Sequence, residues 1–119
     1  MHESKEFKLY LEVINYSNYV RKYVLPDISS VHRDLRIHLL DEIYNLKKYL
    51  VSAQYTKGNI RIKYLTDLYV TVCMIDIITT EIKEFCPNSS KHIVSAIKSL
   101  TKIKNMIYAW RQNPEPTVM

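Results

Sequence analysis

The chain has 119 residues and a net charge of +5, and 47% of its residues are hydrophobic, so it can bury the core of one domain. One glycine and four prolines argue against a β-sandwich or barrel and favour a few long elements. Two cysteines without CxxC spacing exclude a disulfide framework and suit a reducing compartment. No apolar run is long enough to span a membrane and the charged first residues do not form a signal peptide, so we expect a cytoplasmic protein.

Two amphipathic helices are predicted in the first half of the chain. Apolar residues spaced by three and four predict a helix over residues 5–25, and Pro26 ends it because the residue before a proline is biased away from helical angles. A second helix is predicted over residues 30–56. Its apolar residues recur in steps of four and three, as in helix bundles, at Leu39, Ile43, Leu46, Leu50 and Ala53.

Gly58, the only glycine, separates the second helix from a third helix over residues 59–86. Glycine takes left-handed backbone angles at little cost, so we expect Gly58 to stop the second helix. The third segment is rich in β-branched residues, but more than about twenty residues without a turn are too many for a strand. A fourth helix is predicted over residues 89–112, and Asn113-Pro114 ends it.

Four helices of this length with short connections predict an all-α fold, an antiparallel up-down-up-down four-helix bundle. We expect residues 1–113 to form this bundle domain and residues 114–119 to form a short tail.

The third helix has more apolar side chains than one packing stripe requires. A helix that is apolar nearly all round needs a second contact, so we predict a homo-oligomer whose interface lies on this helix. The alternative is that broad packing within one bundle buries the surplus side chains. The predicted interface residues are Tyr69, Val70, Cys73, Met74, Ile77 and Ile78.

Charge is segregated along the chain. Residues 31–63 and residues 85–119 each carry +4, whereas residues 64–84 carry −3. Segregation of this kind favours a polyanionic partner, although solvated helix faces are the plainer interpretation. The candidate nucleic-acid or partner-binding residues are Lys47, Lys48, Lys57, Arg61, Lys63, Lys98, Lys102, Lys104 and Arg111. Three aromatic residues that can stack on bases, or serve in the core, lie among them: Tyr64, Tyr108 and Trp110.

No motif for a catalytic nucleophile, a phosphate loop or an HExxH zinc site occurs, so we expect no catalytic residue, no cofactor and no small-molecule substrate. Asp34, His38 and Glu42 fall on one helical face. A di-metal bundle needs carboxylates from several helices and Glu-x-x-His pairs, which the sequence lacks, so we expect an ion-pair ladder and no metal site.

Two stretches carry a family resemblance: HRDLRIHLLDEIYNLKKYLVSAQYTKGNIRIKYLTDLYVTVCMIDIITTEI and IKSLTKIKNMIYAW. Together they resemble the accessory variability determinant (Avd-like) proteins of diversity-generating retroelements, within a wider family of bacterial four-helix-bundle proteins that includes those encoded in ribosomal-RNA intervening sequences. The resemblance is most specific at the corner of residues 55–59, at Asp67, and at Ile107-Tyr108-x-Trp110.

The resemblance implies a homopentameric barrel of four-helix bundles with a basic surface. It implies that the barrel binds a reverse transcriptase and its template RNA, and so supports mutagenic reverse transcription. Within the family pattern, Lys57, Arg61 and Lys63 match basic positions around the turn between the second and third helices. The alternative is a structural or interaction protein of the intervening-sequence type without a retroelement role.

Overall fold

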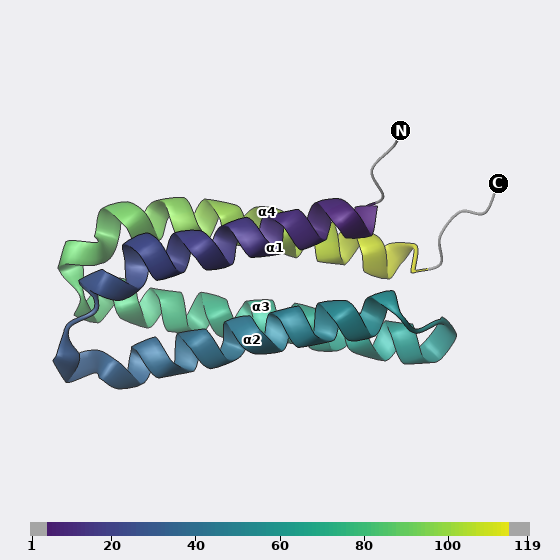
Figure 1. Cartoon of the computed structure of the whole chain (residues 1–119), viewed down its shortest axis with the longest axis horizontal. Coiled ribbons are helices and arrows are strands. Elements are labelled where there is room, and N and C mark those ends of the chain that lie inside the picture. Colours follow the sequence, from purple (N-terminus) through teal and green to yellow (C-terminus); the bar gives the residue numbers. More distant parts are fainter. Residues whose placement is uncertain (1–4, 115–119) are drawn as a thin grey trace.

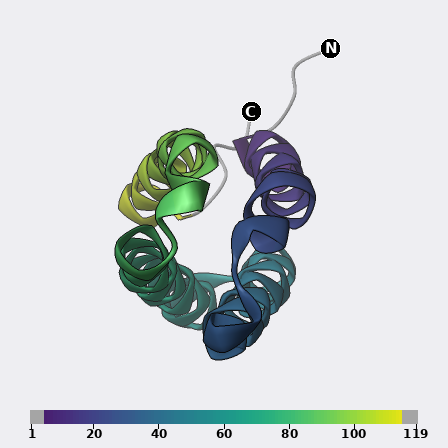
Figure 2. The ribbon, with the colours of Figure 1, turned by 90° about the vertical axis from the view of Figure 1, so that its left-hand side faces the viewer.

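Four long helices make up the fold in the computed structural model, which describes residues 5–114. The predicted tail over residues 114–119 lies, apart from Pro114, outside the described residues. Successive helices run antiparallel (Figure 1), and the view along the bundle shows them around one core in chain order (Figure 2). The predicted all-α, up-down-up-down four-helix bundle is therefore confirmed. The helices are α1 (Lys5–Tyr19), α2 (Arg33–Gln54), α3 (Gly58–Phe85) and α4 (Ser90–Gln112).

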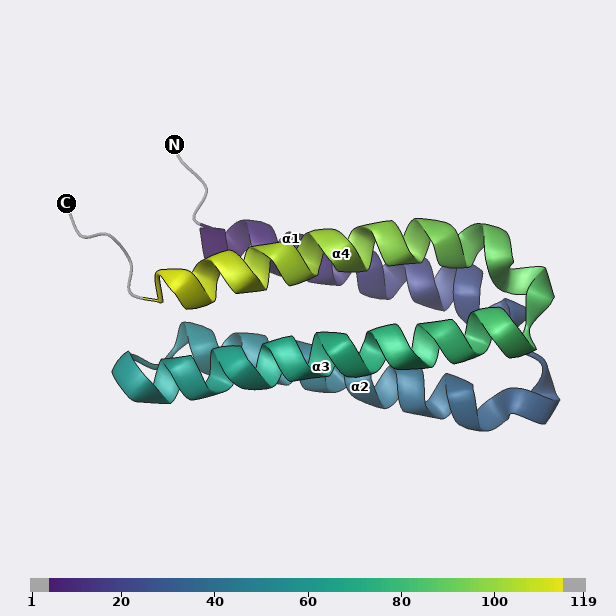
Figure 3. The ribbon, with the colours of Figure 1, turned by 180° about the vertical axis from the view of Figure 1, so that it is seen from behind.

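The core consists of the apolar seams that the spacing predicts. In α2, the residues from Leu39 to Ala53 that recur in steps of four and three are at most 2% exposed. Leu65, Leu68 and Val72 continue the seam on α3, where each is completely buried. α2 and α3 pack against each other more extensively than any other pair, whereas α1 packs more on α4 than on α2. Figure 3 shows α3 and α4 side by side from the opposite direction.

The first helix is shorter and less regular than predicted. α1 ends at Tyr19, and the chain continues as a π-helical turn over Val20–Val24 and a 3-10 turn over Leu25–Asp27. Pro26 lies in the 3-10 turn, where its missing N–H group costs no α-helical hydrogen bond. The wider turn keeps both Val20 and Val24 buried in the core.

Gly58 has a φ of +60°, as expected of a left-handed glycine, but it does not cap α2. α2 already ends at Gln54, and Gly58 is the first residue of α3. A side chain added at Gly58 would meet no atom within 4 Å, so the backbone angle, and not space, requires glycine. This corner lies at the end of the bundle where α1 starts and α4 ends (Figure 1).

Candidate nucleic-acid and partner surfaces

Arg61 lies inside the α2–α3 corner and is only 7% exposed. Its Nε donates a hydrogen bond to the carbonyl of Ala53 at 2.9 Å, and its terminal nitrogens donate to the carbonyls of Gln54 at 3.2 Å and Pro114 at 2.8 Å. Its guanidinium carbon also lies 5.8 Å from the centre of the Trp110 ring. The expectation that Arg61 faces a nucleic acid is therefore wrong, because its donors hold the main chain together.

Two of the predicted cations, Lys48 and Lys63, flank a pair of tyrosines across α2 and α3. The rings of Tyr49 and Tyr64 are stacked, with centres 6.4 Å apart and planes at 29°. Lys48 Nζ lies 5.7 Å from the centre of the Tyr49 ring, and Lys63 Nζ lies 4.8 Å from that of Tyr64. We call these four residues the tyrosine–lysine row. Lys57, at the corner beside this row, is exposed.

Tyr49 is the residue of this row that the sequence did not single out. The signal was present as a Lys-Tyr pair on each side of the corner, at residues 48–49 and 63–64. Only the antiparallel register of α2 and α3 shows that the two pairs meet.

Lys47, although adjacent to Lys48, lies on a different face of the bundle. Its Nζ is 5.5 Å from the centre of the Tyr44 ring, and Arg21 of the π-helical turn approaches the same ring at 5.8 Å. Arg21 also donates a hydrogen bond to the Tyr44 hydroxyl at 3.1 Å. Lys47 therefore belongs to the α1/α2 side and does not extend the tyrosine–lysine row.

The predicted cations of α4 are divided between its two neighbouring helices. Lys102 forms an ion pair with Glu12 of α1 at 2.8 Å, and Lys104 forms one with Asp76 of α3 at 3.6 Å. Lys98 is exposed on the outer side of α4. The predicted cations thus occupy several faces of the bundle and do not make one continuous basic surface.

Tyr69 of α3 lies between two of the α4 cations. Its ring centre is 5.6 Å from Lys104 Nζ and 5.3 Å from the guanidinium carbon of Arg111. Tyr69 and Cys73 are half-buried on this side, whereas Tyr108 is 52% exposed. The α3/α4 side therefore combines aromatic surface with cations.

The surplus apolar residues of α3 are partly exposed, as predicted. Val70 is 55%, Met74 41% and Ile77 54% exposed. Ile78 is only 5% exposed and belongs to the core, so its prediction as an interface residue is wrong. Ile78 lies one residue, or about 100° around the helix, from Ile77, and this rotation is enough to bury it in the core.

Val70, Met74 and Ile77 border a groove between α2 and α3. It contains two adjoining hollows of about 330 and 210 Å³. The residues that line the first are His38, Asp41, Glu42, Met74, Ile77, Ile78 and Glu81. The residues that line the second are Glu42, Asn45, Tyr49, Asp67, Val70, Thr71 and Met74. We call this the acidic groove, because four carboxylates and no lysine or arginine line it.

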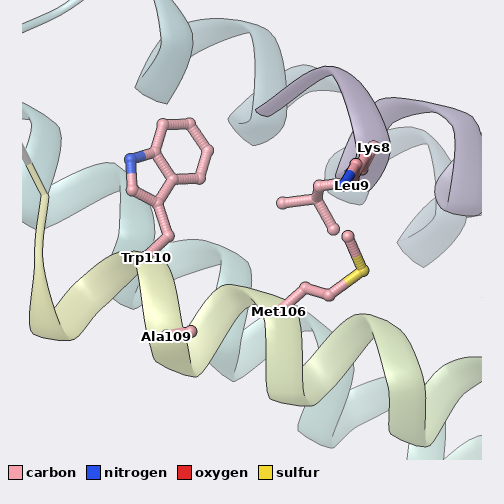
Figure 4. A pocket seen from close by; sticks show the side chains of 5 residues that line it. All are labelled: Lys8, Leu9, Met106, Ala109 and Trp110. Atoms are coloured by element: carbon pink, nitrogen blue, oxygen red, sulfur yellow. The ribbon is translucent and has the colours of Figure 1, made fainter. Parts of the chain in front are cut away.

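Trp110 forms one wall of a smaller apolar pocket between α1 and α4, of about 110 Å³ (Figure 4). Leu9 and Met106 form the opposite wall, with Lys8 and Ala109 also lining the pocket. Trp110 is only 5% exposed, which favours the core alternative for this residue over a platform for bases.

Within residues 5–114, no group of three or more histidine, cysteine or carboxylate side chains is placed to hold a metal ion, and Asp34, His38 and Glu42 make no such group. No helix in the same part of the chain is both long and apolar enough to cross a membrane. The chain matches no family model, no curated protein and no solved structure.

Proposed function

We propose that this chain is a non-catalytic, self-associating accessory protein that binds nucleic acid and a protein partner. In the setting that the family resemblance implies, these are template RNA and a reverse transcriptase, and the protein supports mutagenic reverse transcription. The tyrosine–lysine row is the observation that carries the nucleic-acid part of this proposal.

The row combines the two features that single-stranded nucleic acids require of a protein. Tyr49 and Tyr64 are half-buried, so packing fixes the planes of their rings before a base arrives. Lys48 and Lys63 supply positive charge beside the two rings, where it attracts phosphates. Lys63 also pairs with Asp67 at 3.6 Å, but this is a solvent-exposed pair within one helix, which is weak enough for a phosphate to displace. Lys57 adds a further exposed cation at the corner.

Self-association is supported by apolar surface on the α3/α4 side. Tyr108 is 52% exposed and Ile62 43%, and Ile62 lies on the same side of α3 as Tyr69, two helical turns before it. Contact between two identical acidic grooves would oppose unpaired carboxylates, whereas Lys104 on the α3/α4 side is already paired with Asp76, so the α3/α4 side is favoured for pairing of copies. We therefore place the contact between copies at Ile62, Tyr69, Cys73 and Tyr108. Of the predicted interface residues this keeps Tyr69 and Cys73, because Val70, Met74 and Ile77 border the acidic groove.

Titration of a fluorescent single-stranded RNA against salt tests the nucleic-acid part. We expect the double variant Lys48→Gln/Lys63→Gln to bind about tenfold more weakly, and to lower the slope of log affinity against log salt by about 1.4, because each phosphate contact contributes about 0.7. The matched control is Lys83→Gln/Lys91→Gln, which removes the same charge from exposed positions outside the row. Equal affinity and slope in the two variants would show that the row is not the contact.

A further inference from the structure

The acidic groove carries charge that the chain leaves unneutralised. Among the ion pairs of the described residues, Asp67 has a partner in Lys63 at 3.6 Å, whereas Asp41, Glu42 and Glu81 take part in none. Glu42 and Glu81 are half-buried, so water screens their mutual repulsion less than at an open surface. The chain has a net charge of +5, yet none of its lysines or arginines lines this groove. A cationic partner would relieve this repulsion.

The groove also has an apolar border with helical spacing. Val70, Met74 and Ile77 follow one another at intervals of four and three residues and remain about half exposed. A helix laid along the groove would meet them with its own residues at the same intervals. From Val70 to Glu81 the groove extends about 16 Å, which corresponds to about three helical turns.

We infer that the acidic groove binds an amphipathic helix of another protein, one whose apolar stripe is flanked by lysine or arginine. The stripe packs on Val70, Met74 and Ile77 of α3. Cations beside the stripe face Asp41 on the α2 rim, and a cation one turn beyond the stripe faces Glu81, which follows Ile77 by four residues on α3. The inference rests on the proposed function, since it gives the protein partner of that proposal a docking surface and a chemistry.

A second copy of this chain fits the groove less well. Its most basic helix is α4, but Lys102 and Lys104 of that helix are paired within the chain. On the outer side of α4 this leaves Lys91 and Lys98, with Val94 as the exposed apolar residue between them. One valine does not supply an apolar stripe of three turns. α1 does expose Phe7, Tyr10 and Leu11, but its two lysines are matched by two glutamates, so it lacks the positive charge that the groove requires. Charge and shape together therefore favour a different protein.

Fluorescence anisotropy with a labelled peptide tests the inference. The probe is a helical peptide of about 18 residues, with leucines at intervals of four and three and lysines beside them; a peptide of the same composition in scrambled order is its control. We expect Asp41→Asn/Glu81→Gln to weaken binding of the probe about fivefold. Ile77→Ser should weaken it as well, because it removes apolar contact. The matched control Asp34→Asn/Glu84→Gln, which removes one Asp and one Glu outside the groove, should bind as the wild type does.

Three outcomes would overturn the inference: no preference of the wild type for the probe over the scrambled peptide, equal binding by the two double variants, or loss of self-association in Asp41→Asn/Glu81→Gln. The last outcome would assign the groove to a second copy. Thermal unfolding checks that each variant is folded, and the single variant Asp41→Asn, at an exposed position, replaces the double variant if that does not fold. RNA affinity of the same samples reports on the tyrosine–lysine row separately, so a failed groove and a failed nucleic-acid surface are told apart.

Discussion

Arg61 connects three parts of the chain through one guanidinium group. The last carbonyls of a helix have no partner within it, and Arg61 satisfies those of Ala53 and Gln54 at the end of α2. Through Pro114 the same group holds the segment that follows α4. Hydrogen bonds from a charged donor are stronger than neutral ones, so the bundle end depends on this residue.

Replacement of Arg61 should therefore affect stability more than binding. We expect Arg61→Gln to lower the free energy of unfolding by about 2–3 kcal/mol, because the buried carbonyl of Ala53 and two part-buried carbonyls lose a charged donor. Lys57→Gln, which removes an exposed cation from the same corner, should change it by less than about 0.5 kcal/mol. Urea denaturation provides the measurement. Unchanged stability with weakened RNA binding in Arg61→Gln would restore Arg61 as a contact.

Tyr16 is another buried residue, and its contribution to stability depends on pH. Burial raises the pKa of its phenol above the ordinary value of 10, while a hydrogen bond with Thr79 opposes this rise. Because the folded protein holds this proton more tightly than the unfolded chain does, the stability contributed by neutral Tyr16 is complete below pH 10 and is lost as the pH rises above it.

Between about pH 8 and about pH 11, we expect the wild type to lose about 1.4 kcal/mol more of its free energy of unfolding than Tyr16→Phe does. Urea denaturation at the two pH values measures this difference. Titratable groups that both proteins contain contribute equally to the two losses, so their contribution cancels when the losses are subtracted. Tyr55→Phe is the control, since Tyr55 is 80% exposed and its removal should leave the alkaline loss unchanged. The same loss in all three proteins would contradict the prediction.

At the scale of the helices, the apolar spacing was sufficient to predict which residues form the core. The seams on α2 and α3 depend on the period of 3.6 residues, and this period is written directly in the sequence. β-branched residues in α3 did not prevent a helix, because tertiary packing outweighs local propensity. Even so, Ile77 and Ile78 show a limit, since the width of a buried stripe depends on how closely the neighbouring helix approaches.

The helix ends were harder to predict than the seams. Gly58 has the expected left-handed angle, but it does not end α2. α2 ends at Gln54, three residues separate it from Gly58, and Gly58 is the first residue of α3. The π-helical turn at Val20–Val24 could not be predicted from the sequence. It keeps Val20 and Val24 buried, and the position of the core that buries them is set by the other helices. To predict the tyrosine–lysine row, one would need to know the register between α2 and α3. To predict the role of Arg61, one would need to know the position of a carbonyl 53 residues away in the sequence.

At the scale of the whole molecule, the apolar surface on the α3/α4 side predicts self-association. Light scattering after size exclusion should give the wild type a mass that is a multiple of 14.1 kDa at micromolar concentration. Tyr108→Lys should yield a smaller species, because it adds a like charge to Lys104 and Arg111 on the proposed contact. Tyr55→Lys, at a residue that is 80% exposed and outside this side, should not. A monomeric wild type would refute the prediction.

The sign of the charge changes along the α2/α3 side, and this arrangement has a mechanical consequence. Lys63 lies at the corner end and Glu81 lies about 27 Å further along the same helix. Near a polyanion these opposite charges experience opposite forces, which together exert a torque on the bundle. The corner end would therefore lead as the protein approaches nucleic acid, and a protein docked in the acidic groove would trail behind it. The two partners would thus be held in a fixed order along one bundle, before either touches the other.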